Sequence, residues 1–204
     1  GVAYADEGIE LRSNGISMPI MVMNPEPVAM ETLHRFRLEA EVYDLRSLHE
    51  AIASAKRMPD APPVHVKLDT GMHRLGFTEG DVPELLAALR GQPALKVASI
   101  LSHLVASEDT AQDDFTRTQI NAFTRMADAV DVVLGYRPLR HMANSAGIAR
   151  WPQAHFDMVR VGIGLHGIGA EAEDSKHLLN TVTLRTPIAQ LKRLNTGDTV
   201  GYNR

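Results

Sequence analysis

Lys67 and Arg74 lie in a polar segment that follows an apolar run, in the sequence VKLDTGMHRLGF of residues 66–77. A guanidinium binds anionic oxygens through paired N–H donors, and a desolvated lysine can act as a nucleophile. Gly71 and Gly76 would let the backbone of this segment approach a ligand closely. Two structural alternatives stay open: a solvated arginine in a turn, and a lysine at the end of a strand paired with a carboxylate.

His103 and the segment ANSAGI, residues 143–148, give two further candidate positions after apolar runs. The two ring nitrogens of His103 can orient a neighbouring group, although a hydrogen-bonded structural histidine is the more common case. Asn144 or Ser145 can start a short helix, whose free N–H groups would form an anion site together with the Ser145 hydroxyl. A plain helix cap is the alternative, and the two interpretations are compatible because a cap residue can also face a ligand.

Arg160, Gly162 and Ile163 belong to a fourth segment, VRVGIGLHGIG, which covers residues 159–169. In barrels of parallel strands the active site lies at the carboxyl ends of the strands, and the loops after the seventh and eighth strands often bind phosphate. If the third and fourth segments are these two loops, they predict a phosphate held by Ser145 and by the N–H groups of Gly162 and Ile163. Arg160 would then lie close to the group that carries the phosphate.

A metal-dependent hydrolase is a competing interpretation. His65, Lys67 and Asp69 alternate along one predicted strand, so their side chains point to the same face. A histidine, a carbamylated lysine and an aspartate can hold two metal ions in a barrel. No His-x-His pair lies on any predicted strand and the remaining histidines are scattered, so we expect no metal site.

Apolar runs alternate with amphipathic helical patterns along the chain, which predicts parallel strands joined by right-handed crossovers. The predicted strands cover residues 1–5, 19–23, 39–43, 64–68, 96–101, 139–142 and 157–161. A closed barrel of this kind has eight strands, so we expect an α/β fold, a (β/α)8 TIM-type barrel that lacks its first strand. We expect residues 1–180 to form this barrel domain. Residues 181–204 are rich in Thr, Val, Leu and Ile without a helical stripe, and predict the beginning of a β domain with a turn at 195–198.

The composition argues against several other classes of protein. The 204 residues carry a net charge of −4 at pH 7 and include no cysteine. A mildly acidic chain without basic clusters is not typical of nucleic-acid binding, and a chain without cysteine has no disulfide framework, cysteine-ligated zinc or cysteine nucleophile. The longest apolar stretch, Ile16–Met23, is too short to span a membrane, and the first residues do not resemble a secretion signal.

Four segments, VKLDTGMHRLGF, LSHLVASED, ANSAGI and VRVGIGLHGI, follow one another in an order that resembles bacterial alanine racemases. The resemblance covers essentially the whole chain, and LDTGMHRLGF is its most specific part. It implies a fold-type III enzyme that uses pyridoxal 5′-phosphate to interconvert L-alanine and D-alanine. It also implies a cytoplasmic homodimer that supplies D-alanine for the peptidoglycan of the cell wall.

The resemblance also implies roles for single residues. Arg74 would bond the phenolic oxygen of the cofactor, Arg160 would bond the pyridine nitrogen, and His103 would support Arg160 from behind. Lys67 matches a lysine that is carbamylated in some members, where its negative charge positions the arginine corresponding to Arg74. The residues implied to hold the phosphate are Ser145, Gly162 and Ile163, with Asn144 beside them.

The chain departs from the family at the groups that move the proton. Racemisation needs acid–base groups on both faces of the substrate Cα. The family carries its cofactor lysine in a segment resembling KANAYGHG and its opposite base, a tyrosine, in a segment resembling GYADG. Neither segment occurs in this sequence, Tyr202 does not match that tyrosine, and His166 stands where many members have tyrosine. We therefore expect an incomplete portion of the enzyme, which alone neither binds the cofactor covalently nor racemises alanine.

Two other functions stay open. A serine racemase or a broad-specificity amino-acid racemase would share these motifs. A non-catalytic barrel remnant that binds a phosphate ligand or a partner barrel belongs to a different class. Because a barrel without one strand exposes two strand edges and an apolar interior, we expect the chain alone to self-associate or to be unstable.

Overall fold

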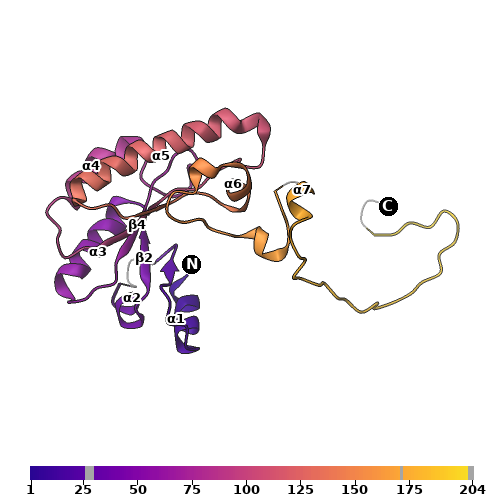
Figure 1. Cartoon of the computed structure of the whole chain (residues 1–204). Helices are drawn as coiled ribbons and strands as arrows, with labels where there is room; N and C mark the ends of the chain where they lie inside the picture. Colours follow the sequence, from indigo (N-terminus) through magenta and orange to yellow (C-terminus); the bar gives the residue numbers. More distant parts are fainter. Residues whose placement is uncertain (26–29, 171, 202–204) are drawn as a thin grey trace.

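The computed structural model describes residues 1–25, 30–170 and 172–201. Its centre is a sheet of five parallel strands, whose order in space is their order along the chain. The strands are β1 (Met21–Val22), β2 (Glu39–Val42), β3 (Val64–Lys67), β4 (Val97–Leu101) and β5 (Leu139–His141). Each step between parallel neighbours needs a crossover, which the helices supply (Figure 1). The predicted α/β fold with successive parallel strands is confirmed.

The two outermost predicted strands are present only as single bridges. Val2 pairs in parallel with Val22 at one edge of the sheet, and Met158 pairs in parallel with His141 at the other. The seven predicted strand positions therefore follow one another in the predicted order, five as strands and two as bridges. This arrangement is an open part of a barrel.

The first predicted strand is short because a helix begins within it. Helix α1 (Ala5–Ser13) starts where the Glu7 carboxylate accepts the backbone N–H groups of Ala3 and Tyr4, at 2.6 and 3.2 Å. A carboxylate that takes up these donors turns the backbone out of the extended conformation. The prediction of a strand over residues 1–5 is therefore wrong beyond the bridge.

The last predicted strand runs beside β5 without forming a continuous ladder. The N–H of Asp157 donates to the Arg140 carbonyl, and the N–H of Arg160 donates to the Ala143 carbonyl, each at 3.0 Å. The Asp157 carboxylate accepts the N–H of Arg140 at 2.8 Å. A side chain thus takes a backbone donor that a continuous ladder would use, and only the Met158 bridge remains between these contacts.

The helices begin and end where local chemistry allows. Helix α3 is capped by Asp44, whose carboxylate accepts the N–H of Ser47 at 2.7 Å, as is typical of an N-cap aspartate. Helix α5 ends at Gly135, which has a left-handed backbone conformation. The helices after α1 are α2 (Met30–Phe36), α3 (Leu45–Arg57), α4 (Val82–Leu89), α5 (Asp113–Leu134), α6 (Ser145–Arg150) and α7 (Ala172–Ser175).

The hydrophobic core lies between the sheet and the helices that cover its outer face. Val42, Val66 and Ile100 are fully buried there. They pack with a stripe of α3 and a stripe of α5 whose residues recur at helical spacing. The stripes are Leu48, Ala51, Ile52 and Ala55 on α3, and Ile120, Phe123, Met126, Ala127 and Val130 on α5.

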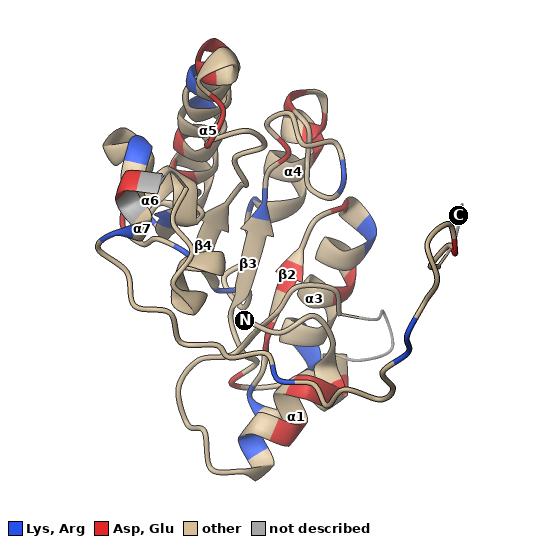
Figure 2. Cartoon of the chain, turned by 90° about the vertical axis from the view of Figure 1, so that its right-hand side faces the viewer, with Lys and Arg blue, Asp and Glu red and all other residues tan. Residues whose placement is uncertain are grey.

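The inner face of the same sheet carries polar side chains. Successive strand residues point to opposite faces, so Glu39 and Glu41 of β2 share the inner face with His65 and Lys67 of β3. Figure 2 shows acidic residues on β2 beside a basic residue at the end of β3. The expected apolar interior is therefore only partly correct, because charged and polar groups occupy its middle.

Residues 181–201 extend away from the sheet and helices as an exposed segment (Figure 1). They contain no helix or strand, so the strand-like patterns in this segment form no sheet here. The predicted turn is present: the N–H of Asp198 donates to the Asn195 carbonyl at 3.1 Å, and the Asp198 carboxylate accepts the N–H of Asn195 at 2.7 Å. A strand needs a partner for its backbone groups, and no described residue offers one to this segment. Residues 202–204 lie outside the described residues.

In the part of the chain that the structure describes, none of the helices has the length and apolar character needed to cross a membrane.

Candidate functional site

A cavity of about 1070 Å³ lies over the inner face of the sheet. It brings together residues from three of the four predicted segments. Six of the eight predicted site residues line it: His103, Asn144, Ser145, Arg160, Gly162 and Ile163. Lys67 and Arg74 are not part of the lining.

Arg160 is fixed by protein acceptors around its guanidinium. Its Nη1 lies 2.5 Å from Nδ1 of His141 and 3.1 Å from the carbonyl of the same residue. Its Nη2 lies 2.6 Å from the Ser102 carbonyl, 3.3 Å from the Met142 carbonyl and 3.2 Å from Nδ1 of His103. The four hydrogens on the two Nη atoms thus have protein acceptors. The Nε–H has no hydrogen-bond partner among the described residues, and this donor is available to a ligand in the cavity.

The electrostatics keep Arg160 charged and its two histidines neutral. Burial lowers the pKa of Arg160 to about 10, against the opposing charge of Glu41. Burial, followed by the charge of Arg160, lowers the pKa of His141 to about 3 and that of His103 to about 4. At neutral pH both imidazoles can therefore accept a hydrogen bond from the guanidinium.

His103 lies within hydrogen-bond distance of Arg160, and so does His141, which was not among the residues predicted from the sequence. His141 is 1% exposed and contacts Arg160 through both a ring nitrogen and the backbone carbonyl. The signal that could have found it is its place on the predicted strand 139–142. There it alternates with Arg140, so the two side chains must point to opposite faces.

Asn144 caps α6 and is one of the two residues that the sequence offered as the start of this helix. Its Oδ1 accepts the N–H of Gly147 at 2.9 Å and the hydroxyl of Ser107 at 2.8 Å. Its amide nitrogen lies 3.4 Å from the Leu104 carbonyl. The side chain is thus engaged by the protein, and its contribution to the site is to fix the start of α6 and with it the position of Ser145.

Ser145 and the glycine-rich loop form one corner of the cavity. The Ser145 Oγ accepts the N–H groups of Gly162 and Gly164 at 3.0 and 3.1 Å. A Cβ atom at Gly162 or Gly164 would lie 3.8 or 3.4 Å from this hydroxyl, so the glycines keep the space beside it open. The N–H of Ile163 has no partner among the described residues. The hydroxyl hydrogen and the free N–H of Ile163 are donors of the kind that bind phosphate oxygens, whereas the N–H groups of Gly162 and Gly164 are taken by the Ser145 Oγ.

Lys67 is paired with a carboxylate, one of the two alternatives that the sequence left open. Its Nζ donates to Oε1 of Glu41 at 2.8 Å. Glu41 is fully buried, and its other oxygen has no hydrogen-bond partner among the described residues. Burial raises the pKa of Glu41, and the bond from Lys67 opposes this shift. The sequence analysis missed Glu41, because a glutamate inside a short strand is more often exposed.

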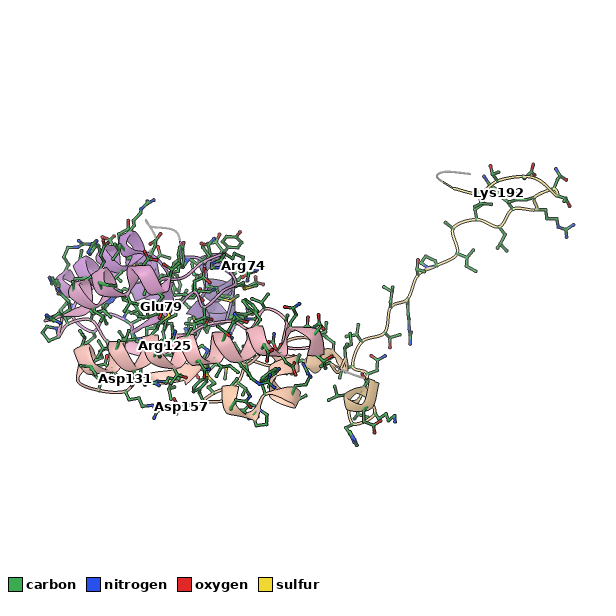
Figure 3. The ribbon with its side chains drawn as sticks, turned by 90° about the horizontal axis from the view of Figure 1, so that it is seen from above. Arg74, Glu79, Arg125, Asp131, Asp157 and Lys192 are labelled. Atoms are coloured by element: carbon green, nitrogen blue, oxygen red, sulfur yellow. The ribbon has the colours of Figure 1, made fainter. Side chains whose placement is uncertain are left out.

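Arg74 is exposed, in the loop after β3, and makes no hydrogen bond or ion pair with the described residues. Figure 3 shows it far from Lys192 of the extended segment. Its predicted role toward a ligand stays a prediction.

The two glycines of the Arg74 loop serve the loop itself. At Gly76, with φ of +126°, a Cβ would lie 2.8 Å from the backbone nitrogen of Asp69. At Gly71, with φ of +132°, it would lie 2.8 Å from the ring of Phe115. At both glycines the backbone is thus approached closely by other parts of the protein.

Asp69 holds the same loop closed and does not join His65 in a metal site. Its carboxylate accepts the N–H groups of Gly71 and His73, each at 3.0 Å. Burial acts to raise the pKa of Asp69, but these bonds and the His73 ring together lower it. Within residues 1–25, 30–170 and 172–201, no three His, Asp or Glu side chains are grouped so that they could hold a metal ion.

The cavity therefore offers two kinds of donor. At one place a charged arginine presents a single N–H, which suits an acceptor such as an aromatic nitrogen. At another the Ser145 hydroxyl and the N–H of Ile163 suit a phosphate. Its lining, as far as the chain is described, includes neither lysine nor tyrosine.

Comparisons with known proteins all lead to one family. The family model for the N-terminal domain of alanine racemase matches residues 1–170. Alanine racemase from Syntrophobacter fumaroxidans is 36% identical over 96% of this chain and 52% of its own length. The relative from Thermodesulfovibrio yellowstonii is 32% identical over 99% of this chain and 52% of its own length.

Solved structures give the same result. Alanine racemase from Bacillus anthracis with bound L-Ala-P superposes with a TM-score of 0.77 and 27% identity, over 99% of this chain and 53% of that chain. The Clostridium difficile 630 enzyme in complex with cycloserine gives a TM-score of 0.76 and 30% identity, over 84% of this chain and 48% of that chain. The chain thus spans about half the length of the relatives it matches. It belongs to the alanine racemase family, within which it matches the N-terminal domain.

Proposed function

We propose that this chain is the barrel portion of a pyridoxal 5′-phosphate-dependent alanine racemase. The observation that carries the proposal is the pairing, in one cavity, of the partnerless Arg160 Nε–H with the donors around Ser145. The whole protein would interconvert L-alanine and D-alanine and supply D-alanine for peptidoglycan. A cytoplasmic homodimer is part of the same proposal, as is the assignment of residues 181–204 to the start of a C-terminal β domain.

The described residues fit the cofactor at its two ends. Arg160 would donate its Nε–H to the pyridine nitrogen. The Ser145 hydroxyl and the N–H of Ile163 would hold the phosphate, and Asn144 keeps Ser145 in place. The N–H of Gly162 would join them only by leaving the Ser145 Oγ, to which it donates here. Arg74 would reach the phenolic oxygen. When bound, the cofactor would supply an electron-withdrawing ring that stabilises the negative charge left at the substrate Cα when its proton departs.

Arg160 would limit how strongly that ring withdraws electrons. A guanidinium only donates hydrogen bonds, and the pKa of Arg160 stays near 10, so it gives up no proton to a pyridine nitrogen at neutral pH. Neutral His103 and His141 accept hydrogen bonds from the guanidinium and add no second positive charge beside it. A ring with an unprotonated nitrogen is a weaker electron sink, which would favour return of the proton over side reactions.

The chain alone would hold the cofactor without a covalent bond. Racemisation needs proton-transfer groups on both faces of the Cα, and the described lining of the cavity has no lysine to bind an aldehyde. Lys67, the one lysine within the four motif segments of the sequence, is engaged by Glu41. Carbamylation of Lys67 stays a hypothesis, and the Nζ that it would modify donates here to Glu41.

A binding titration tests the proposal. Pyridoxine 5′-phosphate has the ring and the phosphate but no aldehyde, so its affinity for the 204-residue chain, measured by calorimetry, needs no lysine. Arg160→Met and Ser145→Ala should each weaken binding by about tenfold or more, because each removes one charge-assisted or phosphate hydrogen bond. Arg125→Met is the matched control, because Arg125 lies on α5 and pairs at the surface with Glu79.

Two outcomes would contradict the proposal. One is the absence of saturable binding to the wild-type chain. The other is equal weakening by Arg125→Met and Arg160→Met. With pyridoxal 5′-phosphate and borohydride, the intact mass of the chain should show no stoichiometric label; a full label on Lys67 would overturn the expectation of non-covalent binding.

A further inference from the structure

A line of hydrogen bonds crosses the inner face of the sheet from β2 to the segment after β5. Oε2 of Glu39 lies 2.9 Å from Nε2 of His65, and Nδ1 of His65 lies 2.7 Å from Oγ of Ser99. The same Oγ lies 2.8 Å from Nε2 of His141, whose Nδ1 lies 2.5 Å from Nη1 of Arg160. Five side chains from successive positions of the sheet are thus joined end to end.

When each imidazole carries a single proton, the chemistry of the two ends fixes the direction of every bond. Arg160 can only donate, so Nδ1 of His141 accepts and the proton of this neutral ring is on Nε2. Nε2–H of His141 then donates to Ser99, whose hydroxyl is left to donate to Nδ1 of His65. The proton of His65 is then on Nε2, where it donates to the Glu39 carboxylate, which only accepts. Each donor in the line meets one acceptor.

A bulge in β4 places Ser99 in this line. Val97 pairs with Val64, but Ser99 and not Ala98 pairs with His65, so Ala98 is an extra residue. Without the extra residue, the alternation of the strand would turn Ser99 to the outer face. The bulge therefore brings a hydroxyl, which can accept and donate at once, between two imidazoles.

We propose that Glu39, His65, Ser99 and His141 form a polarised relay that positions Arg160. The relay fixes both histidine tautomers and holds Nη1, so that the Nε–H of the guanidinium faces the cavity. Ser99 is the positioning residue on which the polarity depends. This inference rests on the proposed function in one respect only, which is the identity of the ligand atom that accepts the Nε–H.

The side chains of the relay are buried, which makes the loss of any of their hydrogen bonds costly. Ser99 and His141 are each 1% exposed and His65 is 8% exposed. Water cannot readily replace a lost partner at such sites, so a broken link leaves a buried polar group unsatisfied. Loss of the Ser99 hydroxyl removes the acceptor of His141 and the donor to His65 together.

The test reads the tautomers directly. Nitrogen-15 NMR of histidine-labelled full chain at pH 8 distinguishes a proton on Nδ1 from one on Nε2. In the wild-type chain His65 and His141 should both carry it on Nε2. In Ser99→Ala the two rings should lose this single tautomer, and the affinity for pyridoxine 5′-phosphate should fall by about tenfold. Ser99→Thr keeps a hydroxyl and should retain both the tautomers and the affinity.

Thr116→Val is the control for the loss of a buried hydroxyl. Thr116 is fully buried on α5, and its hydroxyl has no partner among the described residues. This variant should leave the histidine tautomers and the affinity unchanged. A wild-type His141 with its proton on Nδ1 would overturn the relay, and so would unchanged tautomers in Ser99→Ala. Predicted tautomers without pyridoxine 5′-phosphate binding would instead support the relay and contradict the proposed function.

Discussion

The two faces of the central sheet are stabilised by different physics. On the outer face Val42, Val66 and Ile100 pack against α3 and α5 through many weak contacts. On the inner face a few directional bonds join charged and polar groups, such as Glu41 to Lys67. The outer face should tolerate changes that keep volume, since dispersion is summed over many atoms. The inner face should not tolerate the loss of even a single hydrogen-bond donor or acceptor.

The largest change in the free energy of unfolding should come from a substitution in the core that covers the outer face. Phe123 is fully buried on α5 and meets the ring of Phe156 edge-on, with centroids 5.0 Å apart. Phe123→Ala should lower the free energy of unfolding by about 3–5 kcal/mol, because it removes apolar contacts and leaves a cavity. Urea unfolding measures this change. Val132→Ala, on the exposed side of the same helix, should change the free energy of unfolding by less than about 0.5 kcal/mol. Similar losses in the two variants would contradict the conclusion that packing against the outer face of the sheet carries this stability.

The next effect tests the buried charge pair of the inner face. Glu41→Leu removes the partner of Lys67 and should destabilise the chain by about 3 kcal/mol, because an ammonium stays buried without its carboxylate. The double variant Glu41→Leu with Lys67→Met should recover most of that loss, because no charge is then left unpaired. Both are read by urea unfolding at pH 7. If the double variant is less stable than Glu41→Leu alone, the cost does not come from the lone charge.

Acid should weaken the inner face selectively. The pKa of His141 is about 3 in the folded chain and ordinarily 6.5, so the unfolded chain binds a proton that the folded one does not. The stabilisation is complete above pH 6.5 and is lost as the pH falls toward 3. Between pH 8 and pH 5 the wild-type chain should lose on the order of 1–2 kcal/mol more than His141→Asn, which does not titrate. Unfolding free energies at both pH values measure the difference, and parallel pH profiles would show that His141 is not held neutral.

The sequence could predict the outer face better than the inner one. Apolar runs and helical stripes located five strands and the main helices, because burial against helices leaves a periodic signal. The order of the strands then brought His103, Ser145 and Arg160 to one cavity, although these residues are far apart in the chain.

What the sequence could not predict depends on details of pairing. Ser99 reaches the inner face only because Ala98 is bulged, and a bulge has no signature in this run of residues. Glu41 and His141 find their partners across strands, at distances set by register. The strand-like patterns of residues 181–201 describe side chains that suit a sheet, but a sheet also requires partners for the backbone.

The smallest free-energy change should come from an ion pair that lies on neither face of the sheet. Arg125 of α5 lies 3.1 Å from Glu79, and Figure 3 shows the two residues near each other at the surface. Their side chains are 61% and 66% exposed, so water screens the pair. A double-mutant cycle with Arg125→Met and Glu79→Gln should give a coupling free energy of about 0.2–1 kcal/mol, which falls further in 1 M salt. The same cycle on Glu41 and Lys67 should give a larger coupling that salt hardly changes, because the pair is buried. Equal couplings, or equal sensitivity to salt, would mean that burial on the inner face does not set the strength of its ion pair.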